Sequence, residues 1–321
     1  MTRLGRLAII VVGFAWWPFA AEAAGPSTKP GPVATSKPAK TTKYPVPTDK
    51  EVAESKSLMT SLFGQAAKDV NPKLHKVESA HFIIFSGLAK DVDKDIGDTM
   101  ERMYQTLCKQ FNVEEGEHVW VGKCGVFLLT KDPAKQFFTF ATKVDHLDAE
   151  KAAGAGGYFR CSDIQAYIVM PPPPDGRQAR EMECWRFTLV HESTHAFLYR
   201  YLGDKPVPLW LNEGIADTIA CQVMNSKILD KQMRQSNKEV LMPGDFKDPS
   251  SVFRTVGLSP FDYGIAQSWV RFLVAKDPKA FLKFVALCKE GQEDEPAMKE
   301  AYKMSHADFL KAWADWAKNM R

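Results

Sequence analysis

Two histidines and a glutamate near the middle of the chain have the types and the spacing of a metal site with a base beside it. The segment 190–196 reads Val-His-Glu-Ser-Thr-His-Ala, which places His191 and His195 four residues apart. In a helix, positions four apart lie about 40° apart around the axis, so both imidazoles leave one face and could share a tetrahedral Zn²⁺. Glu192 follows the first histidine and could act on a water molecule at the open side of the metal.

A second segment could complete the ligand set. Residues 209–217 read Leu-Trp-Leu-Asn-Glu-Gly-Ile-Ala-Asp and are expected to form another helix. Glu213 would give a His₂Glu set, which leaves the fourth position of a zinc ion for water. Asp217 lies one turn further along the same face, where its carboxylate could accept the free ring N–H of a zinc histidine. The sequence therefore predicts one zinc ion held by His191, His195 and Glu213.

The motif lies in a segment that is expected to form a long buried helix. Apolar side chains precede and follow it, and Gly203, Pro206 and Pro208 mark the end of the helical pattern. We expect the helix to span about residues 178–202. Imidazoles and a carboxylate on the buried side of such a helix need partners, and a metal ion would provide them.

The two segments together resemble the motifs of the gluzincin metallopeptidases: His-Glu-x-x-His at 191–195, Asn-Glu-Gly at 212–214, and Asp217. The wording Leu-Asn-Glu-Gly-Ile-Ala is most similar to the aminopeptidase-type branch, whereas Asn-Glu-x-x-x-Asp also resembles the thermolysin-type branch. The upstream Gly-Ala-Met-Glu-Asn signature of the aminopeptidases is absent. The resemblance implies a zincin-like fold and zinc-dependent hydrolysis of peptide bonds, with Glu192 as the general base.

The resemblance also implies two roles outside these motifs. In the family, an edge strand just before the zinc helix pairs with the extended substrate, and by position this strand includes Gly157 and Tyr158; an ordinary hairpin is the alternative. A tyrosine or histidine from the later helical part stabilises the charge on the carbonyl oxygen. Tyr263, where a helix is expected to begin, is the first candidate for this second catalytic role, and His306 and Tyr158 are the alternatives.

The N-terminal region has the composition of a targeting segment followed by a linker. Residues 1–23 combine a basic start, an apolar run and Ala-Glu-Ala, as a signal peptide does; an uncleaved anchor is the alternative. Residues 24–50 are rich in Pro, Lys and Thr and read as a linker or pro-segment. The predicted location is secreted or periplasmic, with no stable membrane insertion after cleavage, and residues 51–321 are expected to form the catalytic domain.

The pattern of elements predicts an α+β fold. A sheet-containing part, 51–175, should hold a small mixed sheet and its helices, and a mostly helical part, 176–321, should begin with the zinc helix. Strands are expected at 77–86, 119–130, 158–161 and 166–170. Helices are expected at 51–70, 90–111, 133–140, 209–224, 226–241, 261–274, 278–288 and 305–316.

Composition restricts the partners of the chain. The 42 basic and 39 acidic residues nearly balance, and no basic segment carries interleaved aromatic residues, so no nucleic-acid partner is expected. The expected partner is a peptide or protein substrate. Six cysteines in an oxidising compartment predict disulfides, for which Cys108–Cys124 and Cys161–Cys184 are the pairings considered.

Three functions remain open at this point. They are a zinc-dependent peptidase, a non-catalytic binding or scaffold protein stabilised by zinc, and a helical module without zinc. Structural zinc sites are usually closed by four protein ligands, and only three are found here, which favours the enzyme. Because no motif that would capture a chain terminus is visible, an endopeptidase is favoured over an exopeptidase.

Overall fold

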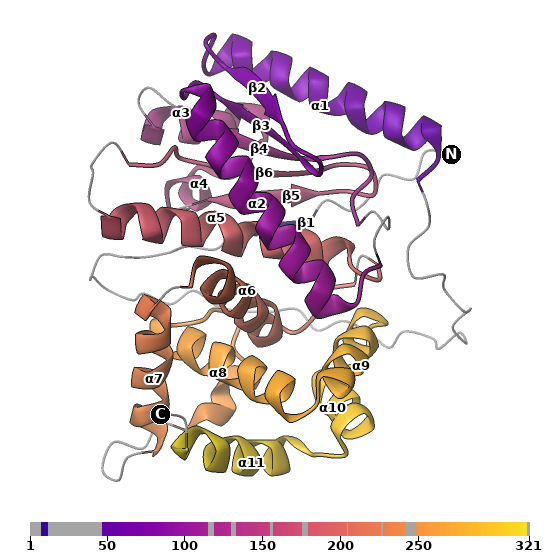
Figure 1. Cartoon of the computed structure of the whole chain (residues 1–321), viewed down its shortest axis with the longest axis vertical. Coiled ribbons are helices and arrows are strands. Elements are labelled where there is room, and N and C mark those ends of the chain that lie inside the picture. Colours follow the sequence, from indigo (N-terminus) through magenta and orange to yellow (C-terminus); the bar gives the residue numbers. More distant parts are fainter. Residues whose placement is uncertain are drawn as a thin grey trace.

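The computed structural model describes residues 8–11, 47–114, 119–129, 133–154, 157–174, 179–203, 205–225, 227–241 and 248–319. These residues form a mixed sheet covered by helices on both faces, followed by a body of helices (Figure 1). The molecule is therefore of the α+β class: within the described residues all strands end by Met170 and only helices follow, as the sequence predicts.

The sheet has six strands in the order β1-β5-β6-β4-β3-β2. The three central strands β3, β4 and β6 are parallel to one another, whereas β5 is antiparallel to β6, β2 is antiparallel to β3, and β1 is antiparallel to β5. The strands are β1 (Ala8–Val11), β2 (His75–Glu78), β3 (Phe82–Ser86), β4 (Cys124–Leu128), β5 (Tyr158–Cys161) and β6 (Ala166–Met170).

Side chains alternate between two buried layers along each strand, because successive residues of a strand point to opposite faces. In β4, Val126 faces the layer of α2 (Lys90–Phe111) and α5 (Ala179–Arg200), while Phe127 faces the layer of α1 (Asp49–Asp69). Three shorter helices lie in the second layer: α3 (Pro133–Thr139), the π-helix η1 (Phe140–Val144) and α4 (Ala149–Gly154). Both faces are covered, and the central strands are accordingly apolar except for Ser86 at the end of β3.

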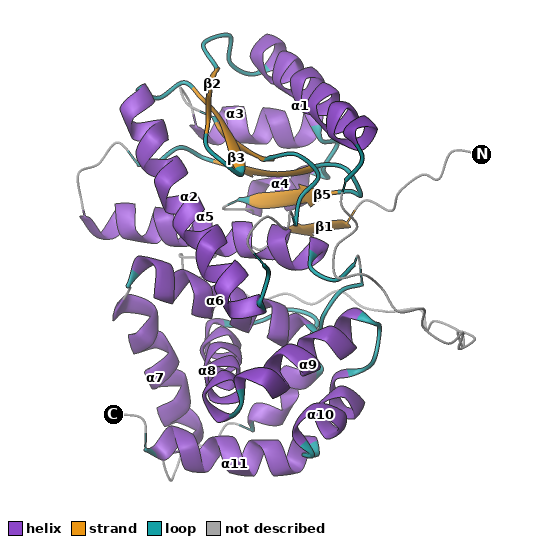
Figure 2. Cartoon of the chain, turned by 45° about the vertical axis from the view of Figure 1, so that its right-hand side comes forward, coloured by secondary structure: helices purple, strands orange, loops and turns teal. Residues whose placement is uncertain are grey.

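The helices that follow α5 in the chain pack on the side of α5 that faces away from the sheet (Figure 2). Its helix α8 begins with a capping box in which Ser259 and Asp262 bond each other's backbone N–H, and α11 begins in the same way with Ser305 and Asp308. The helices are α6 (Leu209–Met224), α7 (Lys227–Leu241), α8 (Pro260–Lys276), α9 (Pro278–Lys289), α10 (Asp294–Tyr302) and α11 (His306–Lys318), with the 3-10 turn η2 (Pro249–Phe253) before α8.

Several sequence predictions differ from the structure. The strand expected at 77–86 is a hairpin of two strands, β2 and β3, and helices α4 and α10 were not predicted. Residues 8–11, expected to belong to a signal peptide, form β1. The disulfide prediction is wrong for this structure, in which no pair of the six cysteines is bonded. The thiol of Cys161, for example, points to the backbone oxygen of Ala196 at 3.8 Å and not to a second sulfur.

No helix within the described ranges has both the length and the apolar character needed to cross a bilayer.

Candidate functional site

The proposed metal ligands lie where two buried helices, α5 and α6, pack against each other. His191 and His195 leave the same face of α5, and their exposed fractions are 0% and 1%. Glu213, in the second turn of α6, is 1% exposed. The parts of both helices that carry these residues, 189–198 and 210–217, are buried because they lie between the sheet and the C-terminal helices. The four-residue spacing and the helix pairing thus bring together the three residues that the sequence predicts.

The ligand atoms of these three residues form a compact triangle. The Nε2 atoms of His191 and His195 are 3.0 Å apart, and Oε2 of Glu213 lies 3.2 Å from the first and 3.4 Å from the second. Two ligands of a tetrahedral zinc ion with bonds of about 2.0–2.1 Å are separated by about 3.3 Å. The observed separations therefore fit three corners of one coordination tetrahedron.

Unsatisfied polar atoms give a second test of the fit. Both carboxylate oxygens of Glu192 are buried without a hydrogen-bond partner among the described residues, and the buried Oε2 of Glu213 faces the two imidazole Nε2 atoms at 3.2 and 3.4 Å. Leaving a buried carboxylate oxygen without a partner is costly, and most native structures avoid it. A divalent cation and a water molecule would satisfy these atoms, and so the donor set and its surroundings fit a metal ion.

Asp217 fixes the orientation of one imidazole. Its Oδ1 lies 2.9 Å from Nδ1 of His191, so the Nδ1–H group donates to the carboxylate and leaves Nε2 facing Glu213. Asp217 is 3% exposed and lies one turn beyond Glu213 on α6, as its spacing predicts. A carboxylate behind a metal-binding histidine holds the ring and raises its basicity.

The buried charges shift the pKa values of the cluster in opposite directions. Burial disfavours a charged His191, but the hydrogen bonds and charges of Asp217 and Glu213 outweigh it and raise its pKa to about 10. Burial also acts to raise the pKa of Glu213, yet the charges of His195 and His191 hold it well below its usual value. Burial raises the pKa of Glu192 to about 7, despite the nearby imidazoles. Glu192 is thus adjusted to exchange protons near neutral pH.

Tyr263 lies beside the cluster, in the first turn of α8. Its ring centroid is 6.5 Å from that of His191. Burial, followed by the charges of Glu213, Asp217 and Glu192, raises the pKa of its hydroxyl, which therefore stays protonated and can donate a hydrogen bond. The alternative His306 lies elsewhere, stacked on Phe253 with ring centroids 3.7 Å apart. The structure thus brings Tyr263, the first candidate, to the site.

The expected substrate strand also borders the site, although its two residues differ in what they contribute. A Cβ atom on Gly157 would lie 3.6 Å from Cγ of Glu192, so the start of β5 is adjacent to the proposed base. The side chain of Tyr158 points to the other face of the sheet, where its hydroxyl donates to Asp145 at 2.7 Å. Tyr158 can therefore offer only its backbone, and its alternative role as a hydroxyl donor at the site is wrong.

The free edge expected of β5 is paired in this structure. Residues Ala8–Val11 lie antiparallel along it, with Val11 opposite Tyr158 and Ala8 opposite Cys161. An extended segment in this position runs toward Gly157 and hence toward Glu192. The edge of β5 is thus able to hold an extended peptide through its backbone.

Two contacts of α5 and α6 were not predicted from the sequence. Lys289 of α9 is 3% exposed, and its ammonium donates to the backbone oxygens of Leu198 and Tyr199 in the last turn of α5 at 2.8 and 3.2 Å. Gly214 of α6 lies against α8 so closely that a Cβ atom there would be 2.7 Å from the carbonyl carbon of Ala266. A glycine inside the helix was the only available signal for the second contact.

The chain was compared with protein-family models and with curated protein sequences. No family model matches the chain, and no curated protein sequence matches it significantly.

Proposed function

We propose that the chain is a zinc-dependent metallopeptidase of the gluzincin type, active outside the cytoplasm. The observation that carries the proposal is the triangle of His191 Nε2, His195 Nε2 and Glu213 Oε2, with separations of 3.0–3.4 Å, beside the unpartnered carboxylate of Glu192. When bound, zinc supplies the positive charge that activates a water molecule and polarises the peptide carbonyl.

Each remaining residue has a defined task in this proposal. Glu192 takes the proton of the attacking water and returns it to the leaving amine, a role that suits a carboxylate whose pKa burial has raised to about 7. The protonated hydroxyl of Tyr263 donates to the carbonyl oxygen as negative charge develops on it. The backbone of β5 holds the peptide extended beside Glu192. Asp217 keeps His191 in the tautomer that presents Nε2.

The proposal is tested by pairing metal analysis with peptide digestion. Zinc content would be measured for the wild-type chain and for Glu192→Gln, and both would be incubated with a peptide library with and without a chelator. Glu192→Gln should retain about one zinc per chain and lose at least about 10²-fold in rate, since the general base is gone. Glu181→Gln changes the same charge at an exposed position of the same helix and should behave as wild type.

Two results would overturn the proposal. A chain that binds zinc but cleaves no peptide in the library, with or without Glu192, is the zinc-stabilised binding or scaffold protein that the sequence also allows. A purified chain without any bound transition metal, and with no uptake of zinc on titration, would exclude both zinc-dependent functions.

A further inference from the structure

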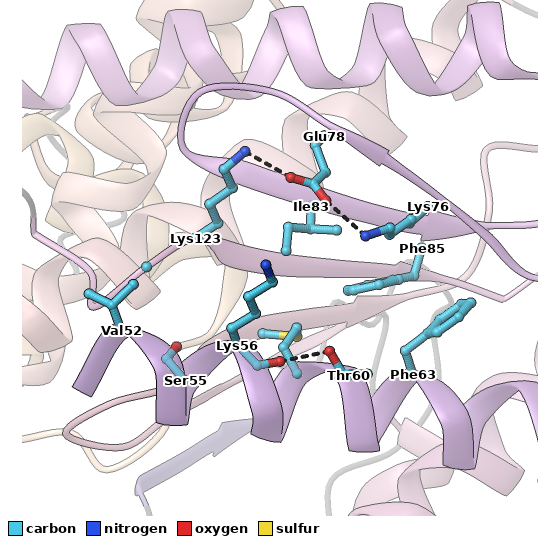
Figure 3. Close-up of a pocket in the computed structure, with 12 residues that line it drawn as sticks. Val52, Ser55, Lys56, Thr60, Phe63, Lys76, Glu78, Ile83, Phe85 and Lys123 are labelled. Carbon is cyan, nitrogen blue, oxygen red and sulfur yellow. Dashed lines mark hydrogen bonds and ion pairs between the residues drawn. The ribbon is translucent and has the colours of Figure 1, made fainter. Parts of the chain in front are cut away.

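A cavity of about 470 Å³ lies on the opposite side of the sheet from the proposed metal site, between α1 and the hairpin of β2 and β3 (Figure 3). Its volume is within the range of about 300–1,000 Å³ that is typical of small-molecule sites. Its lining on α1 runs from Val52 to Phe63. Eleven helical steps correspond to about 16 Å along the axis, so the cavity is an elongated groove, here called the α1 groove.

The floor of the α1 groove is apolar. Phe63 and Phe85 stack with ring centroids 5.1 Å apart, and Met59 and Ile83 continue the apolar surface between helix and strands. Met59 and Phe85 are 3% and 2% exposed, whereas Val52 at the end of the groove is 40% exposed. A preformed cavity with a mostly apolar lining and a few charged groups is the usual form of a site for a small ligand.

Fixed contacts along α1 hold the groove open. The hydroxyl of Ser55 donates to the backbone oxygen of Val121 at 2.9 Å, and a Cβ atom on Gly122 would be 3.3 Å from that hydroxyl. A Cβ atom on Gly125 would be 2.8 Å from Sδ of Met59. Helix α1 therefore packs closely on Gly122 and Gly125. These contacts fix its position, so the groove exists without a ligand.

Positive charge surrounds this apolar floor. Lys76 and Lys123 both pair with Glu78, each at 3.0 Å, and these contacts hold the pKa of Glu78 below its usual value. Lys56 extends from α1 across the groove (Figure 3) and makes no ion pair with any residue that the structure describes. Three lysines against one glutamate leave a net charge of +2 on the lining. The complementary ligand is an anion.

We propose that the α1 groove binds a free alkyl carboxylate, with the carboxylate on the ammonium of Lys56 and the alkyl chain along Met59, Ile83 and Phe85. The ammonium at the mouth supplies a charge-assisted hydrogen bond, and the floor removes the chain from water. The residues of this site are distinct from those of the proposed metal site, so the two proposals stand or fall separately.

The test uses sodium decanoate as the probe and isothermal titration calorimetry on the full chain. Decanoate should bind one site per chain, and hexanoate about a hundredfold more weakly, because four fewer methylenes leave water. Lys56→Met should weaken decanoate binding about tenfold by removing the charged donor. Lys50→Met makes the same change on the same helix outside the lining and should have no effect. Thr60→Trp, which places a bulky ring at the groove, should abolish binding.

Three results would contradict the proposal. Decanol binding as tightly as decanoate would show that Lys56 does not recognise the charge. Equal effects of Lys56→Met and Lys50→Met would indicate nonspecific attraction to a basic surface. Unchanged binding in Thr60→Trp, with the variant folded by circular dichroism, would place the ligand elsewhere. Binding should persist in Glu192→Gln, whether or not that residue is catalytic.

Discussion

Oδ1 of Asp217 lies 2.9 Å from Nδ1 of His191, and both side chains are buried between α5 and α6. This contact decides which nitrogen of His191 faces Glu213 and His195. An amide in place of the carboxylate would keep the shape but lose the negative charge that holds the ring N–H. The contact therefore links a residue outside the ligand triangle to the affinity of the site for metal.

The first prediction is that Asp217→Asn weakens zinc binding about 10–100-fold. A competition titration against a chromophoric chelator measures this change. Asp315→Asn removes a carboxylate on the exposed side of α11 and serves as the control. An unchanged zinc affinity in Asp217→Asn would show that Asp217 does not support the ligand set.

The second prediction concerns pH. Burial lowers the pKa of His191, but the hydrogen bonds that Asp217 and Glu213 accept from it raise the pKa to about 10, so at neutral pH the ring carries an additional proton that zinc must displace. A raised pKa means that the proton competes more strongly as the pH falls. Zinc affinity should thus rise about tenfold per pH unit between about pH 6 and 9. Calorimetry in two buffers of different ionisation enthalpy counts the protons released, and a count of zero would contradict the expectation.

The third prediction compares two helical glycines. A Cβ atom on Gly214 would lie 2.7 Å from the carbonyl carbon of Ala266 and 2.8 Å from Cγ2 of Val270, so Gly214→Ala should lower the free energy of unfolding by about 1–3 kcal/mol. A Cβ atom on Gly64 would have nothing within 4 Å. Gly64→Ala should therefore raise the free energy of unfolding by about 0.5–1 kcal/mol. Urea denaturation measures both. A change in the free energy of unfolding of the same sign in both variants would contradict the close approach of α6 and α8.

The fourth prediction rests on the proposed function and concerns the edge of β5. β1 pairs with residues 158–161 and so occupies the edge that is proposed to hold the substrate. A chain in which β1 stays paired should therefore cleave peptides more slowly than one in which the pairing is broken. The double variant Ile9→Pro, Ile10→Pro removes two backbone N–H groups from β1 and should increase both the cleavage rate and amide exchange at 158–161. The matched variant Ile9→Val, Ile10→Val should resemble wild type. Unchanged exchange would show that β1 does not pair in solution, regardless of any activity.

The residues of the proposed metal site were predicted from the sequence more completely than the helices and strands around them. His191 and His195 are related by helical spacing, and Glu213 and Asp217 by one further turn, so local periodicity alone places them on common faces. Helix α10 was missed, since its apolar positions are few and its first turn is acidic. The pairing of β1 with β5 was also missed, because it joins segments about 150 residues apart and leaves no local pattern.

The α1 groove is another feature that leaves no local pattern in the sequence. Lys56 comes from α1, Lys76 from β2 and Lys123 from the loop before β4, and each alone resembles an ordinary surface lysine. Only the packing of α1 on the hairpin shows that these three lysines surround a cavity with an apolar floor. Periodicity predicted that α1 is helical, but it could not predict where the helix leaves a gap.

The ammonium of Lys289 secures the last turn of α5 from a position 91 residues further along the chain than Leu198. During synthesis, all three proposed metal ligands therefore leave the ribosome well before the side chain that anchors their helix. We expect nascent chains stalled after α6 to capture zinc poorly, and those long enough to expose α9 to hold it as the finished protein does. Maturation of the site would then depend on how far translation has advanced.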